Sequence, residues 1–287
     1  KSKAETMKLQ FLILLAWRNL WSHRMRSLLT IGGVTIGISA IIFLVSLGYG
    51  LEQLVTNQVA NFEAFTVIDI PAANLKTGKI NTESIGRIKA VNHIQAINEV
   101  VDLAGRARLS DKTTTTETVI VGIEKSYFKL AEITPESGRL FNEPSTTPEV
   151  VINIALARLL GFNEEPKKIL GQSLIIDMII PEDLRARDET EGPVVKEAIS
   201  VTVVGVTKDT QNPILYLPIK IVESEGVVNR SSLKIKVDNK EQVEVVRKSI
   251  ENLGFSTEYV GDTVAQIAQF FGLFRVILGG FGMIALL

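Results

Sequence analysis

Residues 27–51 read SLLTIGGVTIGISAIIFLVSLGYGL and hold no charged side chain in 25 positions. A helix rises about 1.5 Å per residue, so residues 28–47 alone would extend about 30 Å, the thickness of the hydrocarbon core of a bilayer. Arg26 precedes the stretch and Glu52 follows it. We therefore predict a transmembrane helix over residues 28–51, with the N-terminus in the cytoplasm and the following domain outside, because positive charge stays on the cytoplasmic side.

The segment before this helix is strongly basic. It holds six Lys or Arg and one Glu in 27 residues, a net charge of +5; since the whole chain carries −1, the other 260 residues sum to −6. A basic head on a mildly acidic body argues against nucleic-acid binding, which needs a basic stripe on the folded domain. We predict that residues 1–27 form a cytoplasmic or interfacial amphipathic segment. Its expected membrane-anchoring residues, which would contact lipids, are Trp17, Arg18, Trp21, Arg24 and Arg26.

Two other interpretations of the apolar stretch fit less well. A cleaved signal peptide could use the small residues Ser46 and Gly48, but the 27 residues before the stretch and its own length are both too long for one. A buried soluble helix rarely extends this far without a polar face. Gly33 and Gly37 lie four residues apart, so we predict that another helix packs there; the alternative is that they only reflect the frequency of glycine in membrane helices.

The chain ends in a second apolar segment, residues 266–287. From Val276 onward it has 12 uncharged residues, about 18 Å of helix, which is too short to span a bilayer. We expect a stalk followed by the start of a second transmembrane helix that is cut short. A C-terminal core helix is the alternative, although Gly279, Gly280 and Gly282 would weaken it in water.

Residues 52–265 alternate between helix and strand patterns, which predicts an α+β extracytoplasmic domain inserted between the two membrane segments. Within it we expect a hairpin of strands 103–109 and 117–123, a solvated loop over 181–198 and a last strand over 255–260. We predict two subdomains. The membrane-proximal one comprises about 52–138 plus 228–265, and a strand-rich one is inserted at about 139–227.

Sequence motifs for catalysis are absent. The chain has no cysteine and no G-x-x-x-x-G-K-[ST] phosphate loop, so thiolate metal sites and nucleotide binding by such a loop are excluded. Of the two histidines, only His93 is available to a Ser-His-Asp arrangement, and a lone histidine is more often structural. We therefore predict no catalytic, cofactor-binding or metal-binding residue and no enzymatic activity in this chain.

Several motifs, taken in order, resemble the N-terminal part of the MacB-type ABC transporter permeases, a mechanotransmitting group that includes LolC and FtsX. The N-terminal motifs are Ala16–Trp21 (AWRNLW), Arg24–Ile31 (RMRSLLTI), Gly37-Ile38 and Ser46–Gly50 (SLGYG). The later motifs are Val121–Glu124 (VGIE), Tyr127-Phe128, Ser137–Phe141 (SGRLF), Val203–Val206 (VVGV) and Phe274–Gly280 (FRVILGG). Together they cover nearly the whole chain.

The resemblance implies a dimeric permease of the cell (inner) membrane, with four membrane helices per subunit and a large extracytoplasmic MacB-like domain after the first. It implies a cytoplasmic ABC ATPase, separate or fused, that binds ATP and Mg. Further expected partners are a second permease chain, identical or paralogous, and an extracytoplasmic adaptor. The expected function is to transmit ATP-driven motion outward for export or extraction of a peptide, lipoprotein or small toxic compound.

Two other functions remain open at this point. A permease-like regulator or scaffold could activate an extracytoplasmic cell-wall enzyme, and capture of such an enzyme by the domain would favour it. An anchored extracytoplasmic enzyme would lose its reaction on His93→Ala, and we expect no such loss.

Overall fold

The computed structural model describes residues 11, 14, 18, 21, 22, 24–59, 64–72, 79–142, 148–186 and 192–286, with some side chains of the two long helices left aside. The helices are α2 (Arg24–Val59), α3 (Thr82–Lys89), α4 (Lys125–Leu130), α5 (Ile154–Leu159), α6 (Ile219–Ser224), α7 (Val243–Asn252) and α8 (Val260–Leu286). The 3-10 helices are η1 (Ala64–Thr66), η3 (Pro166–Ile169), η4 (Glu182–Leu184) and η5 (Lys240–Gln242).

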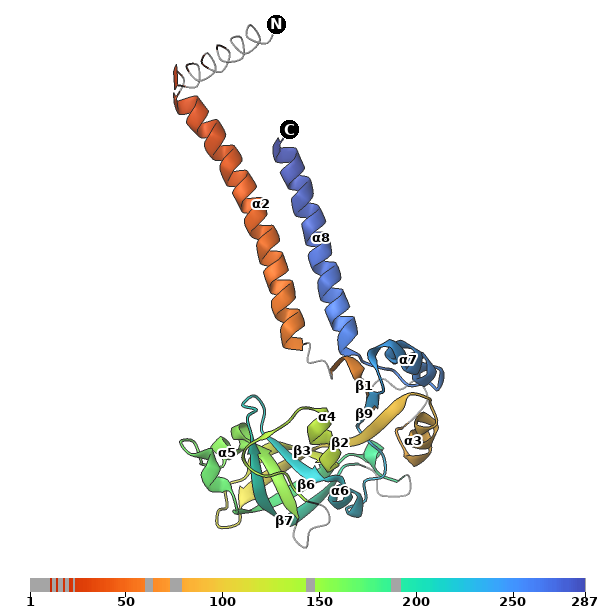
Figure 1. The fold of residues 1–287 in the computed structure, drawn as a ribbon. Helices are drawn as coiled ribbons and strands as arrows, with labels where there is room; N and C mark the ends of the chain where they lie inside the picture. The colour runs from red at the N-terminus through yellow and green to blue at the C-terminus, as the bar shows by residue number, and fades with distance from the viewer. Residues whose placement is uncertain are drawn as a thin grey trace. The chain divides into compact units, whose positions relative to one another are not determined.

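The strands are β1 (Val67–Pro71), β2 (Ile94–Leu109), β3 (Thr116–Ile123), β4 (Pro135–Gly138), β5 (Glu149–Asn153), β6 (Ser173–Ile180), β7 (Val194–Thr207), β8 (Ile214–Pro218) and β9 (Ser232–Val237). Residues 62–260 form one compact unit, and the two long helices belong to another. Figure 1 shows the ribbon of both units.

The long helices lie side by side within their own unit (Figure 1). A Cβ atom added to Gly48 of α2 would lie 3.8 Å from the ring of Phe271 in α8. Helix α2 extends beyond the predicted segment 28–51 at both ends, and α8 continues through the glycines near its end. In the described part of the chain, no helix is both long and apolar enough to cross a bilayer.

Nine strands form one mixed sheet in the order β1-β9-β2-β3-β8-β5-β7-β4, and β6 pairs with both β2 and β7. The pairs β2–β3, β3–β8, β8–β5, β5–β7, β7–β6 and β6–β2 therefore close a circuit of six strands, which we call the ring. The pairs β3–β8 and β5–β7 are parallel. Closing a sheet on itself satisfies main-chain groups that an open edge would expose.

The inside of the ring is apolar because its strands alternate. In β6 the even-numbered residues from Leu174 to Ile180 are buried while their neighbours are only half-buried. These side chains join others from β2, β3, β5, β7 and β8, together with α5 and α6, in what we call the ring core.

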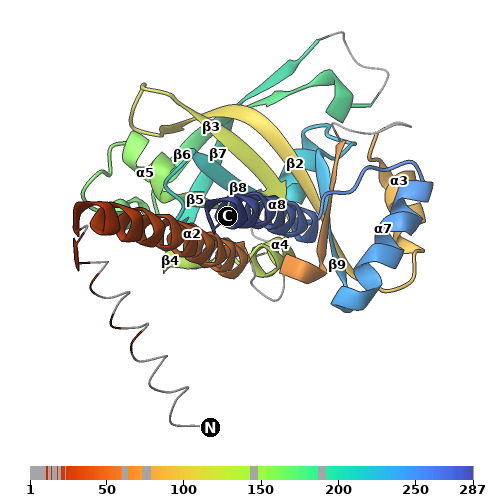
Figure 2. The ribbon, with the colours of Figure 1, turned by 90° about the horizontal axis from the view of Figure 1, so that it is seen from above.

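A second core lies outside the ring. Strands β1 and β9 and helices α3 and α7 supply most of its buried side chains, and half-buried residues in the N-terminal half of β2 pack against them. Its buried members, which we call the helix-covered core, are Ile68, Ile70, Ile80, Ile85, Ile88, Leu233, Ile235, Val237, Val243, Val246, Ile250 and Phe255. Figure 2 shows β2 as one long curved strand that runs from the ring to the side where β9, α3 and α7 lie.

A mixed arrangement of helices and strands is confirmed, but two local expectations are wrong. The segment 181–198 is not all loop: η4 occupies its start, and β7 begins at Val194 because its first residues pair with the end of β6. The segment 255–260 makes only a single bridge, Asp69 to Glu258, because α8 already begins at Val260. The predicted hairpin is confirmed, and β2 extends it to 16 residues.

The expected division near residues 138 and 227 does not follow the sheet. Strands β2 and β3, which the prediction placed in the membrane-proximal part, contribute to the ring. The length of β2 is the physical reason, since its first half pairs with β9 and its second half with β6. The division into a membrane-proximal and an inserted subdomain stays a prediction.

Candidate functional site

The predicted anchoring residues lie at the N-terminal end of the long helix α2. Trp21, Arg24 and Arg26 are exposed there, and so is Arg18 just before it. The Arg24 guanidinium lies 4.8 Å from the centre of the Trp21 ring and donates a hydrogen bond to the Trp21 carbonyl at 3.2 Å. The structure therefore brings two of the predicted residues into a cation–π contact; Trp17 lies outside the described residues.

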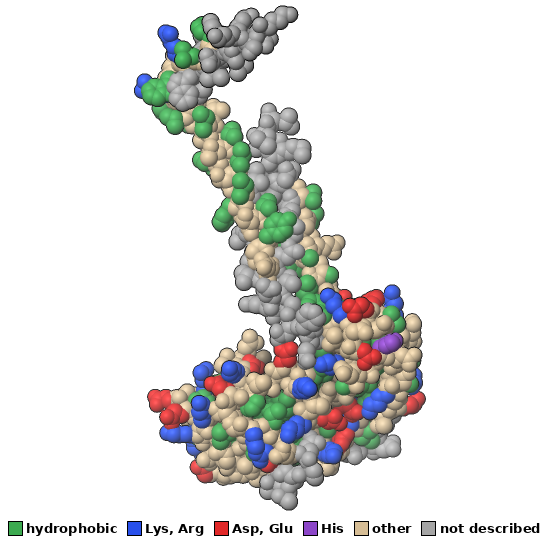
Figure 3. Space-filling view, viewed as in Figure 1, with side chains coloured by type: hydrophobic (Ala, Val, Ile, Leu, Met, Phe, Trp, Pro, Cys, Tyr) green, Lys and Arg blue, Asp and Glu red, His purple; other side chains and the backbone are tan. Residues whose placement is uncertain are grey.

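The shaft of α2 exposes apolar side chains (Figure 3), whereas its N-terminal end carries the basic ones. The exposed apolar residues include Leu28, Leu29, Ile31, Val34, Ile36, Ile38, Ile42 and Phe43. A Cβ atom at Gly33 or Gly37 would meet nothing within 4 Å. The predicted packing face therefore has no described neighbour in this chain, and α8 approaches Gly48 instead, which was not predicted as a packing position.

The segments that connect the compact unit to the long helices meet within residues 62–260. Asp69 and Glu258 exchange both main-chain hydrogen bonds, at 2.9 and 2.7 Å. The Tyr259 hydroxyl donates to the Phe65 carbonyl at 3.1 Å, and the two rings meet edge to face with centroids 6.5 Å apart. We call these four residues the clamp. It joins the stretch after α2 to the stretch that leads into α8.

Cationic side chains fasten the clamp to the helix-covered core. Lys240 of η5 places its Nζ 4.5 Å from the centre of the Phe65 ring, and Arg247 of α7 places its guanidinium 5.4 Å from that of Tyr259. Lys234 of β9 pairs with the Asp69 carboxylate at 2.6 Å. Both connections to the long helices are thus held against the same layer of structure.

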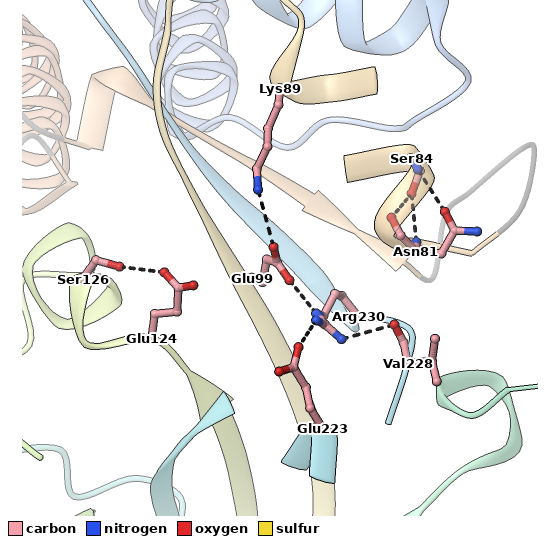
Figure 4. A network of polar contacts seen from close by, with 9 residues as sticks. All are labelled: Asn81, Ser84, Lys89, Glu99, Glu124, Ser126, Glu223, Val228 and Arg230. Carbon is pink, nitrogen blue, oxygen red and sulfur yellow. Dashed lines mark hydrogen bonds and ion pairs between the residues drawn. The ribbon is translucent and has the colours of Figure 1, made fainter. Parts of the chain in front are cut away.

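A second polar cluster, shown in Figure 4, surrounds Arg230 just before β9. The Nε of Arg230 donates to the Glu99 carboxylate of β2 at 2.7 Å, and another guanidinium nitrogen pairs with Glu223 of α6. The guanidinium also donates to the Val228 carbonyl at 3.2 Å, and Lys89 of α3 lies 3.9 Å from Glu99. The Arg230 side chain is only 8% exposed. A buried cation therefore connects three elements.

Glycines in the motifs allow close contacts between strands. Gly138 of β4 pairs with Gly205 of β7. A Cβ atom at Gly205 would lie 2.2 Å from the Arg139 carbonyl oxygen, and one at Gly138 would lie 2.2 Å from that of Val204. Gly138 also has a φ of 78°, which favours glycine. These glycines therefore serve packing.

Arg139 and Phe141 of the SGRLF motif are also structural. Arg139 makes two hydrogen bonds to Glu149 of β5, at 2.7 and 2.6 Å, and Glu149 also accepts from the Asn142 N–H at 3.0 Å. The hydrogen bonds from Arg139, aided by that N–H, hold the pKa of Glu149 below its usual value. Phe141 is fully buried against Phe128, with ring centroids 5.2 Å apart.

Little in the described residues points to catalysis. They contain no group of His, Asp and Glu arranged to hold a metal ion. His93 has a left-handed φ of 69°, and its Nδ1 lies 3.5 Å from the Asp238 carboxylate at the exposed turn before β2. Burial raises the pKa of Tyr216 to about 12 and also raises that of Tyr127, so both phenols stay neutral.

The contacts of the clamp and of Arg230 were not predicted from the sequence. Phe65 and Tyr259 lie 194 residues apart, and Arg230 lies 131 residues from Glu99. Contacts between residues so far apart in the sequence depend on how the strands assemble, and no local spacing of residues predicts them. The order of the two connections, one at each end of the domain, was the one available indication that they would meet.

Residues 27–253 match the family model of the MacB-like periplasmic core domain. A "Probable export ATP-binding/permease protein" of Pseudomonas fluorescens is 23% identical over 256 residues, 83% of this chain and 36% of that protein. The "Macrolide export ATP-binding/permease protein MacB" of Neisseria gonorrhoeae is 23% identical over 248 residues, 81% of this chain and 35% of that protein. The chain thus spans about a third of the length of these relatives.

Among solved structures, the periplasmic region of MacB from Actinobacillus actinomycetemcomitans has a similar fold. The TM-score is 0.52 at 18% sequence identity, and the match covers 71% of this chain and 92% of that one. The likeness agrees with the mixed α/β architecture described above. With the family match over residues 27–253, it confirms the resemblance drawn from the motifs: this chain belongs to the family of the MacB-like periplasmic core domain.

Proposed function

We propose that this chain is part of an ABC transporter permease in which the compact unit lies outside the cell membrane and is moved by the two long helices. The clamp carries this proposal. It bonds the residues after α2 directly to those before α8, so motion of the two helices would reach the domain through one joint. Its two main-chain hydrogen bonds set the register of the two connections, and the Phe65–Tyr259 ring contact together with the Tyr259 hydroxyl holds them against each other.

The membrane arrangement follows from the charge pattern. Residues 27–51 hold no charged side chain in 25 positions. Some of these positions have side chains that the structure does not describe. The Arg24–Trp21 contact at the start of α2 suits the headgroup level, where tryptophan and arginine are favoured. The N-terminus would lie in the cytoplasm and the compact unit outside. Gly33 and Gly37 would then face a helix of a second permease chain, identical or paralogous.

The proposed motion originates in a partner. A cytoplasmic ABC ATPase, separate or fused, would bind ATP with Mg and bring two permease chains together. The export or extraction of a peptide, a lipoprotein or a small toxic compound would follow from the movement of the outer domains, with an extracytoplasmic adaptor as a further partner. The names of the relatives, which include ATP-binding, permease and export, support this class of function.

The test is to break the clamp in one variant and to staple it in another. Asp69→Cys with Glu258→Cys places a disulfide across a hydrogen-bonded antiparallel pair, where Cα atoms lie about 5.5 Å apart, within disulfide reach. Because the chain has no cysteine, no other disulfide competes within it. Phe65→Ala with Tyr259→Ala removes the ring contact and the hydroxyl.

The assay is ATP-dependent transport by the assembled complex in membranes. We expect the staple to keep activity, because it joins residues that already touch, and the broken clamp to lose most of it while ATP is still hydrolysed. Full transport by the broken-clamp variant would contradict the proposal. A control for expression is the amount of folded chain in the membrane.

Topology has an independent test. Lys3→Cys and Thr114→Cys each provide a single thiol in the cysteine-free chain, and Thr114 is exposed in the compact unit. A maleimide that does not cross membranes should label the thiol at position 114 in intact cells or spheroplasts and the thiol at position 3 only after lysis. The reverse pattern would contradict the proposed orientation.

A further inference from the structure

The Arg230 cluster connects residues beside the ring core with residues beside the helix-covered core. Glu223 follows Val222, which is in the ring core, and Lys89 follows Ile88, which is in the helix-covered core. The Arg230 main-chain N–H donates to the Ile80 carbonyl at 2.9 Å, so its backbone is bonded to a residue of the helix-covered core. Its side chain reaches the other way, to Glu223 on α6.

Glu99 occupies the middle of this arrangement. It belongs to β2 just before the strand passes from β9 to the ring, where Val101 already contributes to the ring core. Its side chain is 19% exposed and contacts both Arg230 and Lys89. Figure 4 shows Lys89, Glu99, Arg230 and Glu223 following one another across the junction. The ion pairs therefore connect α3, β2, the segment before β9 and α6.

We propose that Arg230 is a latch that holds the ring and the helix-covered core in one relative orientation through its pairs with Glu99 and Glu223. Burial makes the latch specific. A buried charge that loses its partner is strongly disfavoured, so Arg230 and Glu99, which are 8% and 19% exposed, favour the orientation in which they are paired, and Glu223, which is 40% exposed, adds a weaker pair. Apolar contact, in contrast, tolerates sliding, because the hydrophobic effect is not directional.

The role of the latch rests on the proposed function: motion that enters at the clamp reaches the helix-covered core first and would pass to the ring through this junction. With the latch closed, both cores move as one body. With it open, β2 remains as a continuous connection but the ring can rotate about it.

The test uses the full chain in detergent or nanodiscs and measures amide hydrogen exchange in both cores. Arg230→Met keeps an unbranched apolar stem but removes the charge, so Glu223 loses this cation and Glu99 keeps only the more distant Lys89. A second variant, Glu99→Gln with Glu223→Gln and Arg230→Met, removes all three charges and so leaves no buried charge alone. The matched control is Arg139→Met, which breaks a two-bond ion pair beside β4 and β5 that does not reach the helix-covered core.

In the wild-type chain, we expect α7 amides and ring amides to share one opening event, so their slowest exchange rates coincide. In the triple variant, the melting temperature should return toward the wild-type value, yet α7 amides should exchange at least about tenfold faster than ring amides. The control should keep the two rates together. Coincident rates in the triple variant would overturn the latch, and this second variant decides the matter even if Arg230→Met does not fold.

The exchange experiment needs no ATPase and no substrate, so its failure is distinct from failure of the proposed function. If the rates separate but transport is unaffected in the triple variant, the latch exists and its role in transmission is wrong. If the rates separate and transport falls while ATP hydrolysis continues, both the latch and its role stand.

Discussion

The ring and the helix-covered core both bury apolar side chains against strands of one sheet, but they do so in different ways. The ring pairs its strands into a circuit and brings β4 against β7 at two glycines, so its geometry depends on backbone contacts with no room for a side chain. The helix-covered core is open at β1, and the clamp and the cations of η5, α7 and β9 fasten that side. One part is therefore closed on itself, whereas the other receives the connections to the long helices.

The largest effect should come from filling the close contact in the ring. Gly205→Ala places a Cβ atom 2.2 Å from a main-chain oxygen, so β4 and β7 must separate. We expect a loss of about 3 kcal/mol or more in the free energy of unfolding, measured by chemical denaturation of the full chain. A wild-type midpoint in this variant would show that β4 does not lie against β7 as described.

A smaller effect is expected at the clamp. Tyr259→Phe keeps the ring contact with Phe65 and removes the hydrogen bond to its carbonyl, which should cost about 1 kcal/mol. Hydrogen exchange should speed up most at β1 and at the start of α8, where local opening becomes easier, whereas the slowest amides of β6 should speed up only as much as the loss of unfolding free energy requires. Faster exchange at β6 than at β1 would contradict the place of this hydrogen bond in the clamp.

The Arg139–Glu149 pair predicts a pH dependence on the ring side. Because the pKa of Glu149 is lowered in the folded chain, its contribution to stability is present above the usual glutamic acid pKa, about 4.3, and is lost as the pH falls through the lowered value. Glu149→Gln removes that contribution. The stability difference between wild type and variant should therefore be constant near neutral pH and shrink below pH 4.3. A difference that grows toward acid would refute the assignment.

The smallest effect concerns a glycine with space around it. Gly86 lies inside α3, and a Cβ atom there would meet nothing within 4 Å. Gly86→Ala should raise the free energy of unfolding by about 0.5–1 kcal/mol, because alanine favours a helix. This variant is also the control for Gly205→Ala, since the same substitution should have the opposite sign in the two parts. A loss at Gly86 would mean that α3 is crowded.

The sequence predicted elements better than assembly. The hairpin of β2 and β3 was predicted, and the apolar alternation of β6 and the spacing of Val243, Val246 and Ile250 in α7 indicate which of their side chains are buried. Closure of the ring could not be predicted, because it depends on β6 pairing with two strands far away in the chain. The same holds for Arg230, whose partners come from β2 and α6. Gly138 and Gly205 can be identified in the sequence motifs, but only the pairing of β4 with β7 shows that a Cβ atom would not fit there.

The central claim is that the long helices move the outer domain through the clamp. Leu159 on α5 is 58% exposed, so Leu159→Cys gives one spin-label site in the cysteine-free chain. A second spin label is placed on the outer domain of the partner permease chain. Double electron–electron resonance then measures the distance between the two labels in the assembled transporter. The account predicts a distance that shifts when ATP binds and no longer shifts in the Phe65→Ala/Tyr259→Ala chain. A distance that is the same with and without ATP in the wild-type transporter would contradict it.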